Sequence, residues 1–292
     1  MKRTILMTLA LLAAALLSCN KTEKVGSGEV TVNYTVAMPM TKASLGNGEA
    51  VNYVWYALYR ADGSLVQEFP LQPFAAGSAI CPVTMVRDQS YSVVFVAQHY
   101  EVEGDVKTPA YAVDAATGVL RMPQTAKANS DNYDVFCYVD EVVEYQGATG
   151  AKPVTLTRKV AQVNYFCTSE DAAAAATLGM TPTASEIVLT GVPESYDIIA
   201  GQPSLNTVTV TYEKADLTCD ANLLGTAYCL AGDNLTKAEL KLYKGDELTT
   251  TIDVENLPVE TNKRTNITGA IMTGTVDYQI SLEADVDGTI NH

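Results

Sequence analysis

The sequence predicts an all-β protein made of two consecutive β-sandwiches with one short helix. Short segments in which apolar and polar residues alternate recur along the chain, and this period of two is typical of strands with one buried face. A single segment of the mature chain carries the start and stop signals of a helix. The 292 residues suffice for two domains of ordinary size, whereas one large β domain is the competing arrangement.

The N-terminal segment has the pattern of a bacterial lipoprotein signal peptide, residues 1–18. A basic start is followed by an apolar run, residues 5–17, that is too short to span a bilayer. The run ends in Leu16-Leu17-Ser18-Cys19, the lipobox pattern, so signal peptidase would cut between Ser18 and Cys19 and Cys19 would carry the lipid. Acyl chains such as palmitate hold a protein on a membrane because each buried CH₂ contributes roughly 0.8 kcal/mol. The alternative is an ordinary secretory signal in which this cysteine has no role.

Residues 19–28 are polar and suit a lipidated tether, and we predict the first sandwich over residues 29–157. The second strand of this half is apolar on both faces and ends at Ala61-Asp62-Gly63, which is a hairpin-turn signal. The 16 tyrosines suit strands that keep one face in water. The strands expected here span residues 30–36, 51–59, 90–98 and 133–143.

We predict the second sandwich over residues 158–292, because one strand pattern ends near Thr157 and the alternating segment RKVAQVNYFCT follows it. Ser169-Glu170-Asp171 supply a polar cap and an acidic first turn, and an alanine run then stops at Gly179, so this segment is the predicted helix. Further strands are expected at residues 186–190, 207–213, 225–231, 239–243, 250–254 and 276–284.

The cysteines other than Cys19 are five, an odd number for an oxidising compartment: Cys81, Cys137, Cys167, Cys219 and Cys229. No CxxC pair occurs, so zinc and thioredoxin-type chemistry have no support. Three of these residues lie inside apolar strand patterns, which favours buried free thiols. One disulfide, with Cys219 as a member, is the alternative.

Composition and motifs argue against most kinds of catalysis. His99 and His292 are the only histidines, and the sequence has no phosphate-binding, serine-hydrolase or zinc-protease motif. The oxygen-rich stretches 129–134 and 285–288 fit Asx- and Gly-rich turns better than calcium loops. The net charge of −15 disfavours nucleic acid as a partner. We predict a non-enzymatic protein with no cofactor and no metal site, and we assign Trp55 to the core; a hydrolase would require two converging carboxylates.

One C-terminal segment carries a resemblance to a known family. Residues 256–269, NLPVETNKRTNITG, resemble a signature near the C-terminus of fimbrillin-like lipoproteins, where it leads into one of the last strands. The segment RKVAQVNY, residues 158–165, is similar to the opening of the second domain in that family. The family contains type V pilus subunits and related adhesion lipoproteins of Gram-negative gut and oral bacteria. The resemblance implies two transthyretin-like sandwiches and an outer-membrane, lipid-anchored protein at the cell surface.

The resemblance also implies a mechanism of assembly. In polymerising members a trypsin-like protease removes the first strand, and the groove then accepts a strand from the next subunit. Mapped here, Glu29–Met38 is the removable strand and Lys42 is the first basic residue after it. Family members are typically cut after arginine, yet no arginine lies between Cys19 and Arg60. Lys42 is therefore the candidate processing site, and an uncut anchor or non-polymerising relative is the alternative.

Two classes of function follow for comparison with the structure. The first is a surface lipoprotein that acts in cell adhesion or fimbrial assembly, with other fimbrial subunits or host and bacterial surface ligands as partners. The second is a surface glycan-binding lipoprotein of a nutrient-uptake system. An apolar groove beneath the first strand would favour the first class, and a platform of exposed aromatic side chains would favour the second.

Overall fold

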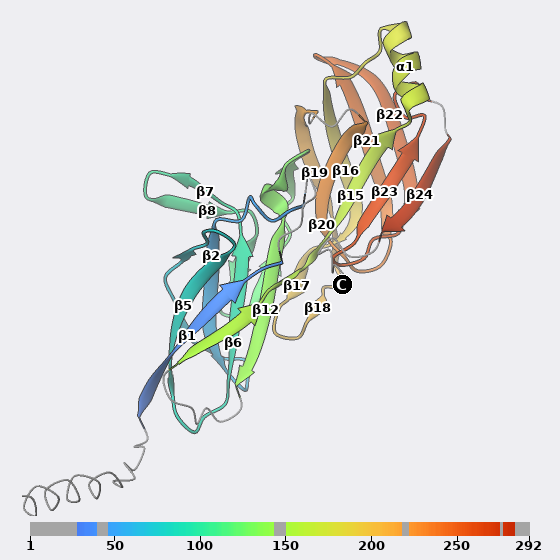
Figure 1. Cartoon of the computed structure of the whole chain (residues 1–292). Helices are drawn as coiled ribbons and strands as arrows, with labels where there is room; N and C mark the ends of the chain where they lie inside the picture. The colour runs from blue at the N-terminus through green and yellow to red at the C-terminus, as the bar shows by residue number, and fades with distance from the viewer. Residues whose placement is uncertain (1–27, 40–45, 143–149, 218–221, 275–276, 284–292) are drawn as a thin grey trace, which may run out of the picture.

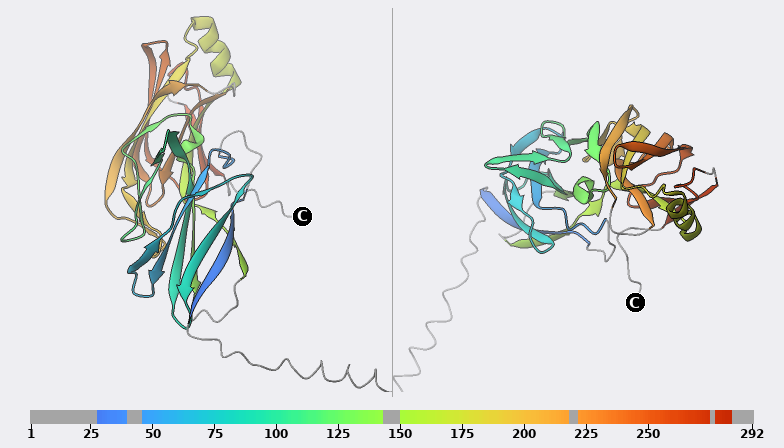
Figure 2. Two further views of the ribbon diagram at one scale, coloured as in Figure 1. Left: turned by 90° about the vertical axis from the view of Figure 1, so that its left-hand side faces the viewer. Right: turned by 90° about the horizontal axis from the view of Figure 1, so that it is seen from above.

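The alternating segments of the sequence form two β-sandwiches that lie end to end (Figure 1). The computed structural model describes residues 28–39, 46–142, 150–217, 222–274 and 277–283. Each strand segment expected from alternation overlaps a strand of the structure, and the predicted all-β class is confirmed. The views of Figure 2 show the same elongated arrangement from the side and from above.

The first sandwich packs a three-stranded sheet against a larger one. The smaller sheet has the order β13-β1-β5 and contains β1 (Glu29–Ala37), β5 (Ser78–Val86) and β13 (Ala151–Thr155). The larger sheet has the order β14-β12-β6-β2-β3 and contains β2 (Tyr53–Arg60), β3 (Leu65–Glu68), β6 (Tyr91–Gln98), β12 (Val135–Val142) and β14 (Thr157–Arg158), with β4 (Gln72–Pro73) paired to β2. The turn at 61–63 joins β2 to β3, as the sequence predicted.

The second sandwich has one five-stranded and one four-stranded sheet. The first, in the order β11-β19-β16-β21-β22, contains β11 (Thr125–Lys127), β16 (Ala184–Pro193), β19 (Thr207–Asp216), β21 (Leu235–Lys244) and β22 (Glu247–Leu257). The second, in the order β20-β15-β23-β24, contains β15 (Val160–Cys167), β20 (Leu223–Leu230), β23 (Arg264–Gly269) and β24 (Tyr278–Glu283). Buried side chains from both sheets form its core, among them Ile187, Leu240 and Tyr165.

The predicted helix is α1 (Ser169–Leu178), at the far end of the second sandwich (Figure 1). Thr168 caps it, because its side chain accepts a hydrogen bond from the amide of Asp171, and Gly179 ends it in the left-handed conformation. The buried Asp171 carboxylate accepts hydrogen bonds from the amides of Met272 and Thr273 and from the Thr273 hydroxyl. The helix is therefore tied to the loop after β23.

The segment between β6 and β12 connects the two sandwiches. Its hairpin β7 (Tyr100–Glu103) and β8 (Val106–Pro109) projects from the first sandwich. A four-stranded sheet then joins β9 (Ala112–Asp114) and β10 (Val119–Arg121) to β17 (Ser195–Asp197) and β18 (Gln202–Pro203). β11 adds in parallel to β19, and a 3-10 turn η1 (Asp131–Tyr133) leads into β12. The first and second halves of the sequence thus share a sheet, and the division after Thr157 stays a prediction.

The central strands β2, β6 and β12 are buried on both faces. One face packs in a core cluster with the β13-β1-β5 sheet, and the other face packs in a second cluster with the connecting segment and the second sandwich. Hydrogen bonds from the Tyr59 hydroxyl to the Ala115 carbonyl and between Gln98 and the Tyr111 backbone fasten that segment to the sheet. This double burial explains why β2 reads as apolar on both faces.

Four of the cysteines are confirmed as buried free thiols, Cys81, Cys137, Cys167 and Cys229, and Cys219 lies outside the described residues. Burial raises the pKa of Cys81, Cys137 and Cys229 to about 12, because it disfavours the thiolate.

We therefore expect these four thiols to resist alkylation by iodoacetamide in the native protein. The thiolate is the reacting form, and burial keeps these thiols protonated, so raising the pH from 7 to 9 should not make them react. Unfolding in guanidinium should make all four react. Peptide mapping by mass spectrometry measures each site separately. Alkylation of Cys137 or Cys229 in the native state would contradict the buried assignment.

Candidate functional site

The first strand occupies the middle of its sheet. β1 pairs in parallel with β13 on one side and antiparallel with β5 on the other, along its whole length on the β5 side. Further backbone bonds extend this pairing, from the Asn33 amide to the Gly150 carbonyl and from the Leu156 amide to the Ala37 carbonyl. Withdrawal of β1 would leave β5 and β13 with unpaired backbone groups that face each other across an empty track.

The inward side chains of β1 and the residue after it form one apolar row. Val30, Val32, Tyr34, Val36 and Met38 alternate with outward residues, and none of them is more than 6% exposed. They pack on Val54, Tyr56, Phe95 and Phe136 of the opposite sheet. The period of two that the sequence shows is therefore the pattern of a strand that lies within one sheet and packs its apolar face on the other.

The Tyr34 side chain makes a polar contact inside the groove. The Tyr34 hydroxyl donates a hydrogen bond to Asp140 Oδ2 at 2.8 Å, and Lys152 Nζ lies 2.8 and 2.6 Å from the two oxygens of the same carboxylate. Tyr34 is on β1, Asp140 is on β12 in the opposite sheet, and Lys152 is on β13. The contact therefore links β1 to its neighbour β13 in the same sheet and to β12 in the opposite sheet.

A pocket of about 210 Å³ lies at the Met38 end of the groove. Met38, Val51 and Phe74 give it an apolar lining, and Glu49 lies at its side. Gly48 has a positive φ of 78°, a conformation that favours glycine, and a Cβ there would also displace the Met38 methyl, which lies 2.7 Å from its position.

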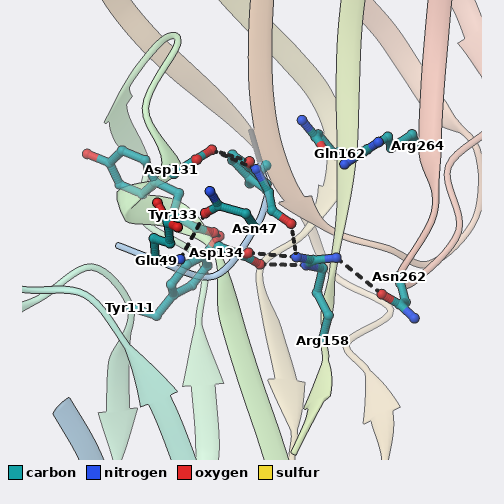
Figure 3. A network of polar contacts seen from close by, with 12 residues as sticks. Asn47, Glu49, Tyr111, Asp131, Tyr133, Asp134, Arg158, Gln162, Asn262 and Arg264 are labelled. Carbon is teal, nitrogen blue, oxygen red and sulfur yellow. Dashed lines mark hydrogen bonds and ion pairs between the residues drawn. The ribbon is translucent and has the colours of Figure 1, made fainter. Parts of the chain in front are cut away.

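A buried polar network lies at the junction of the two sandwiches (Figure 3). Arg158 on β14 is 1% exposed, and its guanidinium donates to both oxygens of the fully buried Asp134, at 2.7 and 2.9 Å. It also donates to the Gly46 carbonyl at 2.5 Å and to Asn262 Oδ1 at 3.4 Å, and it stacks on the Phe136 ring. A buried charge is stable only where its donors are satisfied, and here one side chain joins several separate segments.

Residues of the oxygen-rich stretch 129–134 complete this network. Asp131 Oδ1 accepts hydrogen bonds from the Gly46 amide at 3.1 Å and from the Tyr228 hydroxyl at 2.5 Å. Asn129 bonds to the backbone amide of Thr226 and to the Ser185 hydroxyl. These oxygens bind partners within the chain, as a turn assignment predicts, and their role in joining the sandwiches was not evident from the sequence.

The family-like signature lies beside the same junction. Asn262 has a positive φ of 62° in the turn before β23, and its amide donates to the Val160 carbonyl. Lys263 pairs with Glu260, and Arg264 Nε donates to Gln162 Oε1 at 3.0 Å. The prediction of a polar turn that precedes a strand is confirmed, and this turn supplies one contact of Arg158.

The other candidate residues divide between those that the structure describes and those that it does not. Ser18, Cys19 and Lys42 lie outside the described residues, so signal cleavage, lipidation and processing stay predictions. The His99 ring lies 2.9 Å from the Ala50 carbonyl. Within the described ranges, no group of three or more His, Cys, Asp or Glu side chains has the arrangement of a metal site. The helices among those residues are too short or too polar for a bilayer crossing.

Aromatic side chains do not form an exposed platform on the part of the chain that the structure describes. Trp55 is 5% exposed, and its indole donates to Glu68 Oε1 at 2.7 Å, so its assignment to the core is confirmed. The partly exposed pair Tyr53 and Tyr100 meets edge to face, and Lys107 lies over the Tyr53 ring. Of the two features set out above, an apolar groove for adhesion or assembly and an aromatic platform for glycan binding, the described residues show the groove beneath the first strand.

This arrangement of two sandwiches has counterparts among solved structures. A candidate cell adhesion protein from Bacteroides uniformis shares it with a TM-score of 0.51 and 11% identity over 88% of this chain and 96% of that chain. A fimbrial assembly protein from Parabacteroides distasonis has a TM-score of 0.47 and 13% identity over 88% and 96%. The C-terminally truncated tip fimbrial protein Mfa3 from Porphyromonas gingivalis has a TM-score of 0.47 and 12% identity over 88% of this chain and 99% of that chain. At identities of 11–13% the likeness concerns the fold alone.

The likeness to the Bacteroides uniformis protein shows a shared fold, and the all-β sandwich fold expected from the sequence is confirmed. The chain itself belongs to the family described as "Family of unknown function (DUF6562)", whose model matches residues 21–292. No curated protein matches the sequence at a significant level.

The junction network gives a prediction about stability. Substitution Arg158→Met should lower the free energy of unfolding by about 3–5 kcal/mol, because it leaves the buried Asp134 carboxylate without its ion-pair partner. The matched control is Arg121→Met, whose 3.6 Å pair with Asp114 is exposed and should contribute at most about 1 kcal/mol. Urea unfolding midpoints measure both. Equal effects of the two substitutions would contradict the central role of Arg158.

Proposed function

We propose that this protein is a non-enzymatic, outer-membrane-anchored surface lipoprotein that acts in cell adhesion or fimbrial assembly and exchanges its first strand. The observation that carries the proposal is the position of β1, which lies between two strands and fills an apolar groove with alternate side chains. A strand so placed leaves a complete binding track when it departs, and a strand donated by another subunit can satisfy the same backbone groups.

Lys42 is the residue at which we propose that β1 is separated from the rest of the chain. It follows the last inward residue of the groove, Met38, by four positions, so a cut there frees the whole inward row. The partners in this proposal are other fimbrial subunits or surface ligands. The lipid on Cys19 lies on the far side of β1 in the sequence, so a cut at Lys42 would also release the remainder from the anchor.

Limited trypsin treatment of residues 20–292 tests the exchange. We expect a cut after Lys42, loss of the β1 fragment over time, and a ladder of oligomers that survive unboiled denaturing gel electrophoresis. Mass spectrometry identifies the cut, and Lys42→Gln is the control that should remain monomeric under the same treatment. An intact or nicked monomer that never forms a ladder would overturn strand exchange from this end and favour an anchor or accessory adhesin.

Substitution Cys19→Ala tests the anchor separately. The wild-type protein should fractionate with the outer membrane and incorporate labelled palmitate, whereas the variant should do neither, because it has no thiol to accept the lipid. Substitution Asn20→Ala, beside the lipidation site, is the matched control and should behave as wild type. Membrane association of Cys19→Ala would show that the lipobox assignment is wrong.

A further inference from the structure

The strand β1 carries a polar group at the centre of an otherwise apolar row. Tyr34 is fully buried, with two valines on its N-terminal side and Val36 and Met38 on its C-terminal side. Its ring meets the Phe95 ring at a centroid distance of 5.0 Å, and its hydroxyl reaches across the sandwich to Asp140. The groove therefore has five side-chain positions, and at the third a carboxylate accepts a hydrogen bond from the strand that fills it.

The acceptor has a second partner besides Tyr34. Lys152 binds both oxygens of Asp140, and Asp140 is 6% exposed. Lys152 is also the register partner of Tyr34 on β13, and its ammonium lies 5.8 Å from the Tyr34 ring centroid. Asp140 is on β12 in the opposite sheet, which is paired to β6 independently of β1, so its carboxylate marks a defined position along the groove, and Lys152 returns to it when a strand pairs with β13 again.

We propose that the Asp140–Lys152 pair selects the strand that enters the groove and sets its register, by requiring a tyrosine opposite Lys152 with apolar side chains two and four positions to either side. This inference rests on the proposed exchange of β1, and it names the partner: an extended segment of another subunit with a tyrosine in an apolar alternation. A strand with phenylalanine at that position fills nearly the same volume but removes the hydroxyl that donates to Asp140 Oδ2, and that oxygen then keeps the Lys152 ammonium.

The choice of register follows from the same contact. A shift by one residue turns the apolar row outward and is excluded by the pleat. A shift by two keeps the apolar row inward, so hydrophobic burial alone distinguishes it weakly, but it places Val32 or Val36 against Asp140 and puts the Tyr34 hydroxyl among apolar side chains. A shifted strand therefore loses the hydrogen bond between its buried tyrosine hydroxyl and Asp140, and the loss of a buried hydrogen bond is costly.

The test uses residues 20–292 with a specific protease site placed in segment 40–45, so that the chain is cut after β1 whether or not Lys42 is processed. The nicked protein is unfolded in guanidinium and refolded with excess synthetic peptides of residues 28–39, supplied in competing pairs. One pair is wild type against Tyr34→Phe, and another is wild type against a peptide in which Val32 and Tyr34 are exchanged. A Thr35→Ala peptide, altered on the outward face, is the matched control.

We expect the wild-type peptide to be retained in the folded fraction about ten- to a hundredfold over Tyr34→Phe and over the exchanged peptide, with Thr35→Ala close to wild type. In the protein variant Asp140→Leu, this preference for tyrosine should fall to within about threefold. Equal retention of wild-type and Tyr34→Phe peptides in the unaltered protein overturns the proposed selection and leaves strand exchange intact. Failure of every peptide to replace the resident strand overturns strand exchange, and the selection with it. The comparison on the unaltered protein decides the matter even where Asp140→Leu fails to fold.

Discussion

The buried guanidinium of Arg158 is the contact on which the arrangement of the two sandwiches depends. It holds Asp134 at the start of β12, the carbonyl of Gly46, and Asn262 in the turn before β23, which are far apart in the sequence. Arginine suits this position because its planar fork of donors can satisfy several acceptors at fixed angles, whereas a lysine ammonium offers a single point charge. Every segment that meets there has its position set by the same charge.

The strands β2, β6 and β12 are held in place from both sides. Because β2, β6 and β12 are covered on both faces, they cannot shift toward one sandwich without opening a cavity on the other side. Tyrosines contribute to this in a way that the sequence did not indicate. The expectation was strands with one face in water, yet most described tyrosines are buried and several bond to carbonyls, as Tyr59 does to Ala115 and Tyr111 does to Tyr133. Their hydroxyls fasten layers together.

The sequence predicted the strands with regular alternation and the one helix, because period and capping are local properties. It missed β5, whose inward residues Ala79, Cys81, Val83 and Met85 alternate without a break, because Pro82 argues against a strand. Pro82 is tolerated since β5 is the last strand of its sheet. The short strands from β7 to β11 carry too few residues for a pattern. The groove could be expected from the resemblance alone, whereas the Tyr34–Asp140 contact joins residues 106 positions apart and needed the structure.

The structure separates the part that exchange would alter from the part that must persist. The four inward residues of β1 and Met38 after it belong to the core cluster of the first sandwich, and none belongs to the cluster that joins the two halves. Gly46, which follows the segment containing Lys42, is held by Asp131 and Arg158 through its own backbone. A cut at Lys42 would therefore leave the new N-terminal segment fastened at the junction while the strand before it leaves. The junction contacts of Arg158 and Asp131 go to residues outside β1, so under the proposed exchange we expect the second sandwich and the connecting segment to keep them.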